Sequence, residues 1–147
     1  MALTRGAWTC TTVNKMAVWT CTVTATTGES DIYTLKTPAE LDCTKKWTVF
    51  VNTAAATLDG TVAAMPVDIY GGFSDNFTVG TGGAIAVVDG CLLIADVIAD
   101  VRTAVGTYTF DPDNTAAAAK CPYYAILIDG ESAVSAGDCT FKIVQAK

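Results

Sequence analysis

The sequence predicts a mainly β fold, an antiparallel β-sandwich or barrel of about eight to ten short strands with one helix near residues 94–104. Short apolar runs rich in β-branched and aromatic residues recur along the chain, separated by clusters of Gly, Asp, Asn and Thr. Only one segment shows helical periodicity. A chain of 147 residues has the size of one domain, so we treat residues 1–147 as a single β-rich domain, with residues 1–7 as a candidate flexible N-terminal arm.

A repeated tetrapeptide near the N-terminus predicts a β-hairpin. Trp-Thr-Cys-Thr occurs at residues 8–11 and again at 19–22. In an extended strand its Trp and Cys share one face and its threonines lie on the other, as expected for a sheet with one solvated face. We expect the hairpin loop at Asn14–Ala17, with Val13 opposite Val18.

The same register places Cys10 opposite Cys21, so this pair is either a cross-strand disulfide or two reduced thiols. The six cysteines, at positions 10, 21, 43, 91, 121 and 139, include no CxxC pair, which argues against a zinc site or a c-type haem. The N-terminal sequence has no apolar core of signal-peptide length. We therefore expect folding in a reducing cytoplasm, with the cysteines as small core side chains.

The central part of the chain contains several candidate strands. Their ranges are Ile32–Leu35, Trp47–Val51, Thr61–Tyr70, Ala84–Val88 and Tyr108–Phe110. Pro66 has no N–H to donate, so its strand is expected at a sheet edge or a bulge. Thr37–Glu40 combines a Thr N-cap, a Pro and a capping-box Glu, which predicts a helix of one or two turns. Asn52–Gly60 is expected to be a loop rich in Ala and Thr.

One helix is predicted at Ile94–Ala104. Its apolar residues fall at i, i+3, i+4 and i+7, at Ile94, Val97, Ile98 and Val101. Asp96 and Asp100 lie elsewhere on the helical wheel. They either pair around a metal ion or form part of a solvated face, and the solvated face is the more common arrangement.

The C-terminal region predicts two strands around which the other strands pack. Tyr123–Asp129 is a dense apolar run and is expected to be a buried strand. Thr140–Gln145 alternates, with Phe141 and Ile143 on the face opposite to Lys142. The turn-rich segment between the two strands suggests a hairpin or a crossed pair.

Composition excludes several classes of function. The chain has no His, which removes Ser–His–Asp and Cys–His catalysis and His metal ligands. The net charge is −6 with only nine Lys and Arg, so no basic stripe is available for nucleic acid. No apolar run approaches the roughly 20 residues of a membrane helix. We expect no membrane and no nucleic acid partner.

No catalytic, metal or cofactor site is predicted. The glycines at 80, 82 and 83 lack the following GK[ST] of a phosphate-binding loop and are expected in strand connections. Asp111, Asp113 and Asn114 supply oxygen ligands for Ca²⁺ in principle, but the DxDxDG spacing stops short and a turn is favoured. Asp129 and Glu131 flank a turn without an identifiable partner. No Ser lies in a GxSxG elbow, so we do not expect an enzyme.

The three tryptophans, Trp8, Trp19 and Trp47, allow one alternative function. Together they could form an aromatic platform for a sugar, although Trp in a strand more often belongs to the core. This alternative is a surface-exposed β-module of fibre, tail or adhesin type that binds host carbohydrate or a receptor.

Four segments resemble small structural proteins encoded beside capsid genes in tailed bacteriophages. They are residues 47–52, 64–75, 121–130 and 136–145, and the similarity lies in an Ala-, Thr- and Gly-rich, His-free, short-stranded sequence with a compact C-terminal strand pair. The resemblance implies a virion component, most simply a capsid decoration (cement) protein, made in the host cytoplasm. It also implies a homo-oligomer, with a trimer favoured, that binds the major capsid protein or other virion proteins.

Low charge and many Ala, Val and Thr side chains predict broad, weakly polar contact surfaces. Several weak contacts made together bind far more tightly than one. The loops expected to make these contacts are Asn52–Gly60, Gly71–Gly83 and Asp111–Lys120.

Overall fold

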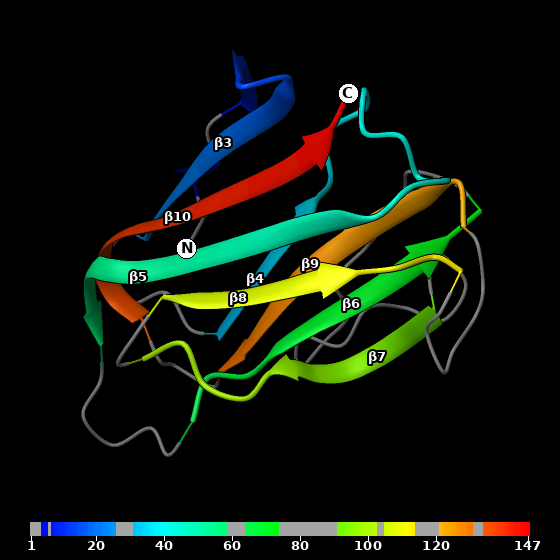
Figure 1. Cartoon of the computed structure of the whole chain (residues 1–147). Helices are drawn as coiled ribbons and strands as arrows, with labels where there is room; N and C mark the ends of the chain where they lie inside the picture. The colour runs from blue at the N-terminus through cyan, green and yellow to red at the C-terminus, as the bar shows by residue number, and fades with distance from the viewer. Residues whose placement is uncertain are drawn as a thin grey trace.

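The computed structural model describes residues 4–5, 7–25, 31–58, 64–73, 91–102, 105–113, 121–130 and 134–147. Within these residues the chain is all β without a helix, and two antiparallel sheets face each other (Figure 1). The predicted β-sandwich is therefore confirmed. The strands are β1 (Thr4–Arg5), β2 (Thr9–Val13), β3 (Met16–Ala25), β4 (Asp31–Lys36), β5 (Trp47–Leu58), β6 (Val67–Gly72), β7 (Cys91–Ile98), β8 (Gly106–Phe110), β9 (Tyr123–Gly130) and β10 (Val134–Ala146).

The larger sheet has the strand order β1-β3-β10-β5-β8, and β2 also pairs with β3. Because β10 occupies the other edge of β3, β1 and β2 lie along the same edge, and the sheet has five strand positions. The smaller sheet has the order β4-β9-β6-β7. Side chains alternate between inside and outside: Val49 and Val51 in β5 are fully buried, whereas Phe50 between them is half-buried.

The two predicted C-terminal strands both form, but they do not make a hairpin. β9 is an inner strand of the smaller sheet, between β4 and β6, whereas β10 is an inner strand of the larger sheet, between β3 and β5. The chain therefore crosses from one sheet to the other between them (Figure 1). Phe141 and Ile143 of β10 are fully buried and Lys142 is exposed, as the alternation predicted.

An aromatic cluster joins the two sheets. Trp47, at the start of β5, pairs with Phe110, at the end of β8, and their rings stack with centroids 5.2 Å apart. Tyr124 of β9, in the smaller sheet, lies 4.8 Å from Phe110 and 5.8 Å from Trp47. All three side chains are almost completely buried. Aromatic pairs at these separations add about 0.5–1.5 kcal/mol each to the stability gained from burial of their area.

The N-terminal hairpin forms with a tighter turn than predicted. Val13 pairs with Met16, so the loop is only Asn14 and Lys15, whose φ angles are 49° and 65°. Positive φ at both central residues defines the tight turn whose twist matches that of the flanking strands. The predicted register, with Val13 opposite Val18, is therefore wrong by two residues.

The predicted helix at residues 94–104 is wrong, because β7 occupies this region up to Ile98. The step from Val67 to Ile69 in β6 covers two positions, while the paired step from Ile98 to Ile94 in β7 covers four. This bulge breaks the alternation of a strand and puts apolar residues four apart, which imitates the helical period. The bulge is held by Asp96, which has φ of 51° and donates its N–H to Asp68 Oδ1 at 2.8 Å.

Other local predictions also require correction. Thr37–Glu40 forms a single turn, in which Leu41 N–H donates to Pro38 O, and no helix follows. The N–H and the hydroxyl of Thr37 both donate instead to the carbonyl oxygen of Tyr124, at 3.0 Å and 3.2 Å, so Thr37 is bonded to β9 and does not cap a helix. Pro66 precedes β6, an inner strand, so the edge position is wrong, whereas the bulge expected as the other possibility is present in the pairing of β6 with β7.

The segment predicted as the Asn52–Gly60 loop continues β5 as far as Leu58. Its Ala-rich sequence has low β propensity, but β10 pairs with it beyond a bulge. Gly137 of β10 makes this approach feasible, because it has φ of 87° and a Cβ there would collide with the carbonyl oxygen of Ala55. The predicted strand at Ala84–Val88 lies outside the described residues.

The bulge in β7 can be tested at Asp96, whose side chain is exposed. We expect Asp96→Gly to change the free energy of unfolding by less than about 0.5 kcal/mol, and Asp96→Val to lower it by about 1–2 kcal/mol, because a β-branched residue is strained at positive φ. Urea unfolding measures both values. A helix would give the opposite order, since Gly costs about 1 kcal/mol in a helix and Val costs less.

Asp100 provides a pH-dependent test of the segment after β7. It accepts hydrogen bonds from Met65 N and Arg102 N and pairs with the Arg102 guanidinium at 2.6 Å. These bonds hold the pKa of Asp100 well below its usual value. The stability from ionised Asp100 is thus present above about pH 4 and is lost as the pH falls.

We expect Asp100→Asn to lower the free energy of unfolding by about 1–2 kcal/mol at neutral pH. The difference from the native chain should shrink at about pH 2.5 in urea titrations, because Asp100 binds a proton in the unfolded chain at that pH while its lowered pKa keeps it ionised in the folded chain. Asp96→Asn is the control and should leave stability unchanged at both pH values. An Asp100→Asn effect that is independent of pH would contradict the role of the charge.

Candidate functional site

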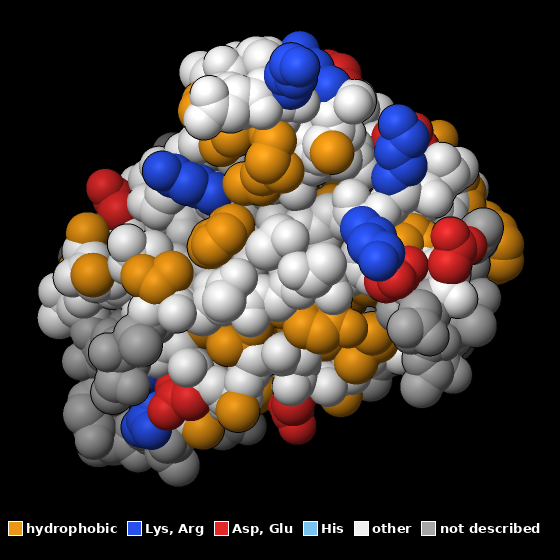
Figure 2. Space-filling view, in the orientation of Figure 1, with side chains coloured by type: hydrophobic (Ala, Val, Ile, Leu, Met, Phe, Trp, Pro, Cys, Tyr) orange, Lys and Arg blue, Asp and Glu red, His pale blue; other side chains and the backbone are white. Residues whose placement is uncertain are grey.

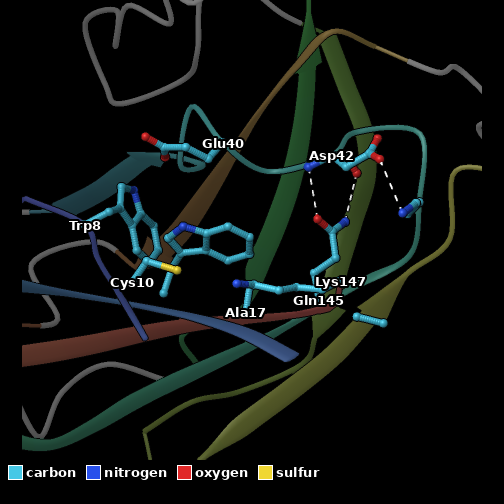
Figure 3. A pocket seen from close by; sticks show the side chains of 10 residues that line it. Trp8, Cys10, Ala17, Glu40, Asp42, Gln145 and Lys147 are labelled. Atoms are coloured by element: carbon cyan, nitrogen blue, oxygen red, sulfur yellow. Dashed lines mark hydrogen bonds and ion pairs between the residues drawn. The ribbon is translucent and has the colours of Figure 1, made fainter. Parts of the chain in front are cut away.

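A groove of about 490 Å³ lies at one end of the sandwich (Figure 3). It is bounded by the β2–β3 hairpin, the connection from β4 to β5 and the end of β10. The residues that line it are Trp8, Cys10, Ala17, Trp19, Glu40, Asp42, Lys45, Gln145, Ala146 and Lys147. In Figure 3, Trp8 and Cys10 lie on one side of the groove, and Asp42, Gln145 and Lys147 lie on the other.

The two tryptophans reach the groove from the same hairpin. Trp19 follows Ala17 on the inner face of β3 and is only 5% exposed. Trp8 precedes β2 and is half-buried, and its Nε1–H donates to the carbonyl oxygen of Lys36 at 2.8 Å. Because Lys36 ends β4 in the other sheet, this bond fixes the indole ring of Trp8 against the mouth of the sandwich.

Gln145 holds the opposite wall in place. Its Oε1 accepts from Asp42 N at 3.0 Å, and its Nε2 donates to the carbonyl oxygens of Asp42 at 2.8 Å and Lys46 at 3.2 Å. The side chain is buried, with 5% of its surface exposed. A buried amide that satisfies both backbone groups of Asp42 fixes the β4–β5 connection on β10.

The charges around the groove are balanced. Glu40 and Asp42 are acidic, and Lys45 and Lys147 are basic. Asp42 Oδ1 accepts from the hydroxyl and N–H of Thr44, which lowers the pKa of Asp42, and Lys45 Nζ lies 3.8 Å from its Oδ2 and lowers the pKa further. Asp42 is therefore engaged in its own loop.

The structure separates the three predicted tryptophans. Trp8 and Trp19 meet at the groove, whereas Trp47 lies in the core with Phe110 and cannot contribute to a surface platform. The Trp-Thr-Cys-Thr repeat was the sequence signal that set the first two apart. Sequence reasoning missed Glu40 and Gln145 as groove residues, because it placed Glu40 in a helix and Gln145 in a strand without a partner.

The predicted acidic pairs do not come together as metal sites. Asp96 lies in the β7 bulge and Asp100 is paired with Arg102. Asp111 Oδ1 accepts from Asp113 N at 3.0 Å, which makes the predicted turn, and Lys46 Nζ lies 3.3 Å from Asp111 Oδ2. Asn114 and Glu131 lie outside the described residues. Among the described residues, no group of three or more His, Cys, Asp or Glu gathers as metal ligands.

The described cysteines Cys10, Cys21, Cys43, Cys121 and Cys139 are not joined by disulfide bonds. Cys10 faces Trp19 across the hairpin, so the predicted position opposite Cys21 is wrong. Burial raises the pKa of Cys43, with smaller contributions from the charges of Asp42 and Cys121. Burial also raises the pKa of Cys139 to about 12. Raised pKa values disfavour the thiolate, so Cys43 and Cys139 are poor nucleophiles.

A second surface lies on the outside of the larger sheet. The pairing registers align its outward side chains in rows across β2, β3, β10, β5 and β8, formed by Thr9, Thr11, Val18, Thr20, Thr22, Phe50, Thr48, Asn52, Thr107, Thr109, Thr140, Lys142 and Val144. We call this surface the threonine face. Lys142 is the charged side chain within these rows, and Asp138 is a second one in the next row, where it accepts a hydrogen bond from the Thr24 hydroxyl opposite it. Figure 2 shows a mostly uncharged surface over these strands, interrupted by hydrophobic areas and separate basic side chains.

The threonine face contains a shallow hollow of about 180 Å³. Phe50, Asn52, Val105, Thr140 and Lys142 line it. Val105, just before β8, is 54% exposed. The hollow thus offers a small, partly apolar socket, with the basic side chain of Lys142 in its wall, on a sheet surface of mostly uncharged polar residues.

The loops predicted to make contacts are only partly described. Residues 52–58 belong to β5 and Gly71 and Gly72 to β6, so these parts are not loops. Phe73 is 88% exposed, and residues 111–113 form a turn. The rest of Gly71–Gly83 and Asp111–Lys120 lies outside the described residues.

Comparisons with known proteins give no relatives. No family model, no curated protein and no solved structure matches this chain. In the part of the chain that the structure describes, no helix is long and apolar enough to cross a membrane.

The groove wall can be tested at Gln145. We expect Gln145→Ala to lower the free energy of unfolding by about 1–3 kcal/mol, because backbone groups of Asp42 and Lys46 lose their partner. Trypsin should then cleave faster after Lys45 and Lys46, since the loop is released from β10. Thr140→Ala, on the outer face of the same strand, is the control and should leave both measurements unchanged. Normal cleavage in Gln145→Ala would show that the loop is held by other contacts.

Proposed function

We propose that this chain is a structural protein of a tailed-bacteriophage virion, a capsid decoration protein that binds the shell through several protein–protein contacts. The observation that supports an assembly role is the threonine face, an extended sheet surface whose described rows contain two charged side chains, Lys142 and Asp138. The virion assignment itself rests on the resemblance of the sequence. Homo-oligomers, with a trimer favoured, and the major capsid protein are the proposed partners.

The threonine face has the composition of an interface centre. Charged side chains are depleted there because removing them from water is unfavourable, and Thr and Val lose little hydration when they are covered. Thr48 Oγ1 and Thr109 Oγ1 lie 2.9 Å apart and form a hydrogen bond with each other, so one of the two hydroxyl hydrogens already has its acceptor when this pair is covered. A sheet of five strand positions also fixes its side chains rigidly, which reduces the entropy lost on binding.

The hollow beside Val105 would accept an apolar side chain from the partner. One such contact is weak. A trimer that makes three of them on neighbouring capsid subunits binds more tightly, because the first contact holds the other two sites at a high effective concentration. This mode of action requires no pocket chemistry and no cofactor.

The first test is made on purified particles. Mass spectrometry and imaging should find the protein on intact virions in many copies, and native mass spectrometry should show a homo-oligomer in solution. Absence from the particles, or a free monomer that hydrolyses a substrate, would refute the proposal.

A matched pair of variants tests the surface. Val105→Glu places a charge at the hollow, and Tyr123→Glu places the same charge on β9 of the smaller sheet, away from the threonine face, where Tyr123 is 43% exposed. We expect Val105→Glu to lower particle occupancy at least about tenfold, corresponding to about 1.4 kcal/mol. Tyr123→Glu should stay within about twofold of the native chain. Equal effects of the two variants would mean that the threonine face is not the contact surface.

A further inference from the structure

We infer that the groove between Trp8, Trp19 and the β4–β5 connection binds an uncharged sugar, such as one or two rings of a glycan. This site is separate from the threonine face, because its tryptophans lie on the inner side of the hairpin and at the mouth of the sandwich. Sugar binding goes beyond the assembly role and does not depend on it.

The size and lining of the groove suit a small ligand. Its volume of about 490 Å³ falls within the range of roughly 300–1,000 Å³ that is usual for small-molecule sites. Such sites combine aromatic walls with a few polar groups that fix orientation. Two indoles with carboxylate and amine groups at the rim follow this pattern, since a sugar ring has both an apolar face of C–H groups and an edge of hydroxyls.

The aromatic wall is already fixed before a ligand arrives. The Nε1–H of Trp8 donates to Lys36 O at 2.8 Å, so the ring position is set by the protein and no donor needs to be desolvated on that side. Trp19 is held by its burial in the core. A fixed wall binds more tightly than a mobile one, because less rotational freedom is lost.

The polar groups divide into those that build the groove and those that remain for a ligand. Gln145 and Asp42 are committed to each other and to the loop. In the described part of the chain, the Glu40 carboxylate and the Trp19 indole N–H make no hydrogen bond, and the side chain of Lys147 makes none either. One acceptor and two donors therefore remain to meet the hydroxyl groups of a sugar.

The balance of charge selects a neutral ligand. Two aromatic rings beside a carboxylate would also attract a cation, but Lys45 and Lys147 line the same groove and oppose it. An anionic ligand would meet Glu40 and Asp42 in the same way. An uncharged polyhydroxylated ring avoids both penalties.

The experiment begins with an array of immobilised bacterial surface oligosaccharides and common mammalian glycans. The best-bound glycan is then titrated in solution against the native chain and followed by intrinsic tryptophan fluorescence. We expect Trp8→Ala to weaken binding at least about tenfold and Glu40→Gln to weaken it about threefold to tenfold. Glu40 is exposed and makes no bond in the described chain, so Glu40→Gln retains the fold even if Trp8→Ala does not.

Lys142→Ala is the control, because Lys142 lies on the outer face of β10, away from the groove. It should bind the glycan as the native chain does. The inference is overturned if no glycan on the array binds, if binding is unaffected by Trp8→Ala and Glu40→Gln, or if peptides and organic cations bind the groove in preference to sugars. Particle occupancy of Glu40→Gln keeps the two proposals apart, since that variant should decorate virions normally while losing glycan affinity.

Discussion

The contact of Trp47 and Phe110 with Tyr124 is the constraint on which the rest of the structure depends. It presses the larger sheet against the smaller one at the end where β5 begins, β8 ends and β9 starts. Neither sheet alone could bury these rings. The indole N–H of Trp47 has no hydrogen-bond partner within the described structure, so packing rather than polar pairing holds this centre. The apolar area that is buried compensates for the unsatisfied donor.

Both candidate surfaces follow from this packing. Once the sheets are pressed together, the inner side of the hairpin closes over the end of the core, and Trp8 can reach the carbonyl of Lys36 in the opposite sheet. Gln145 at the end of β10 then meets the β4–β5 connection, and a groove remains between them. The side chains that alternate with the core residues are left outside, and they form the threonine face.

The sequence predicted the sandwich and most strands because alternation and β-branched composition are local signals. It did not predict which strands pair. The apolar run of β9 and the alternating run of β10 are compatible with a hairpin or with opposite sheets, and only long-range packing decides. The predicted helix failed because the bulge held by Asp96 and Asp68 changes the spacing of apolar residues, which periodicity alone cannot detect. One wall of the groove is built by two residues over a hundred positions apart, Asp42 and Gln145, so the sequence identified the tryptophans of the groove but not its shape.

The position of β10 has a consequence for synthesis of the chain. It follows every other described strand in the sequence, yet it lies between β3 and β5 in the middle of the larger sheet. Until β10 has left the ribosome, β3 and β5 each have an unpaired strand edge. The larger sheet then cannot form as one continuous sheet. The larger sheet is therefore completed only after residues 134–146 have left the ribosome, and a nascent chain stalled before residue 134 exposes two strand edges that invite aggregation or capture by chaperones.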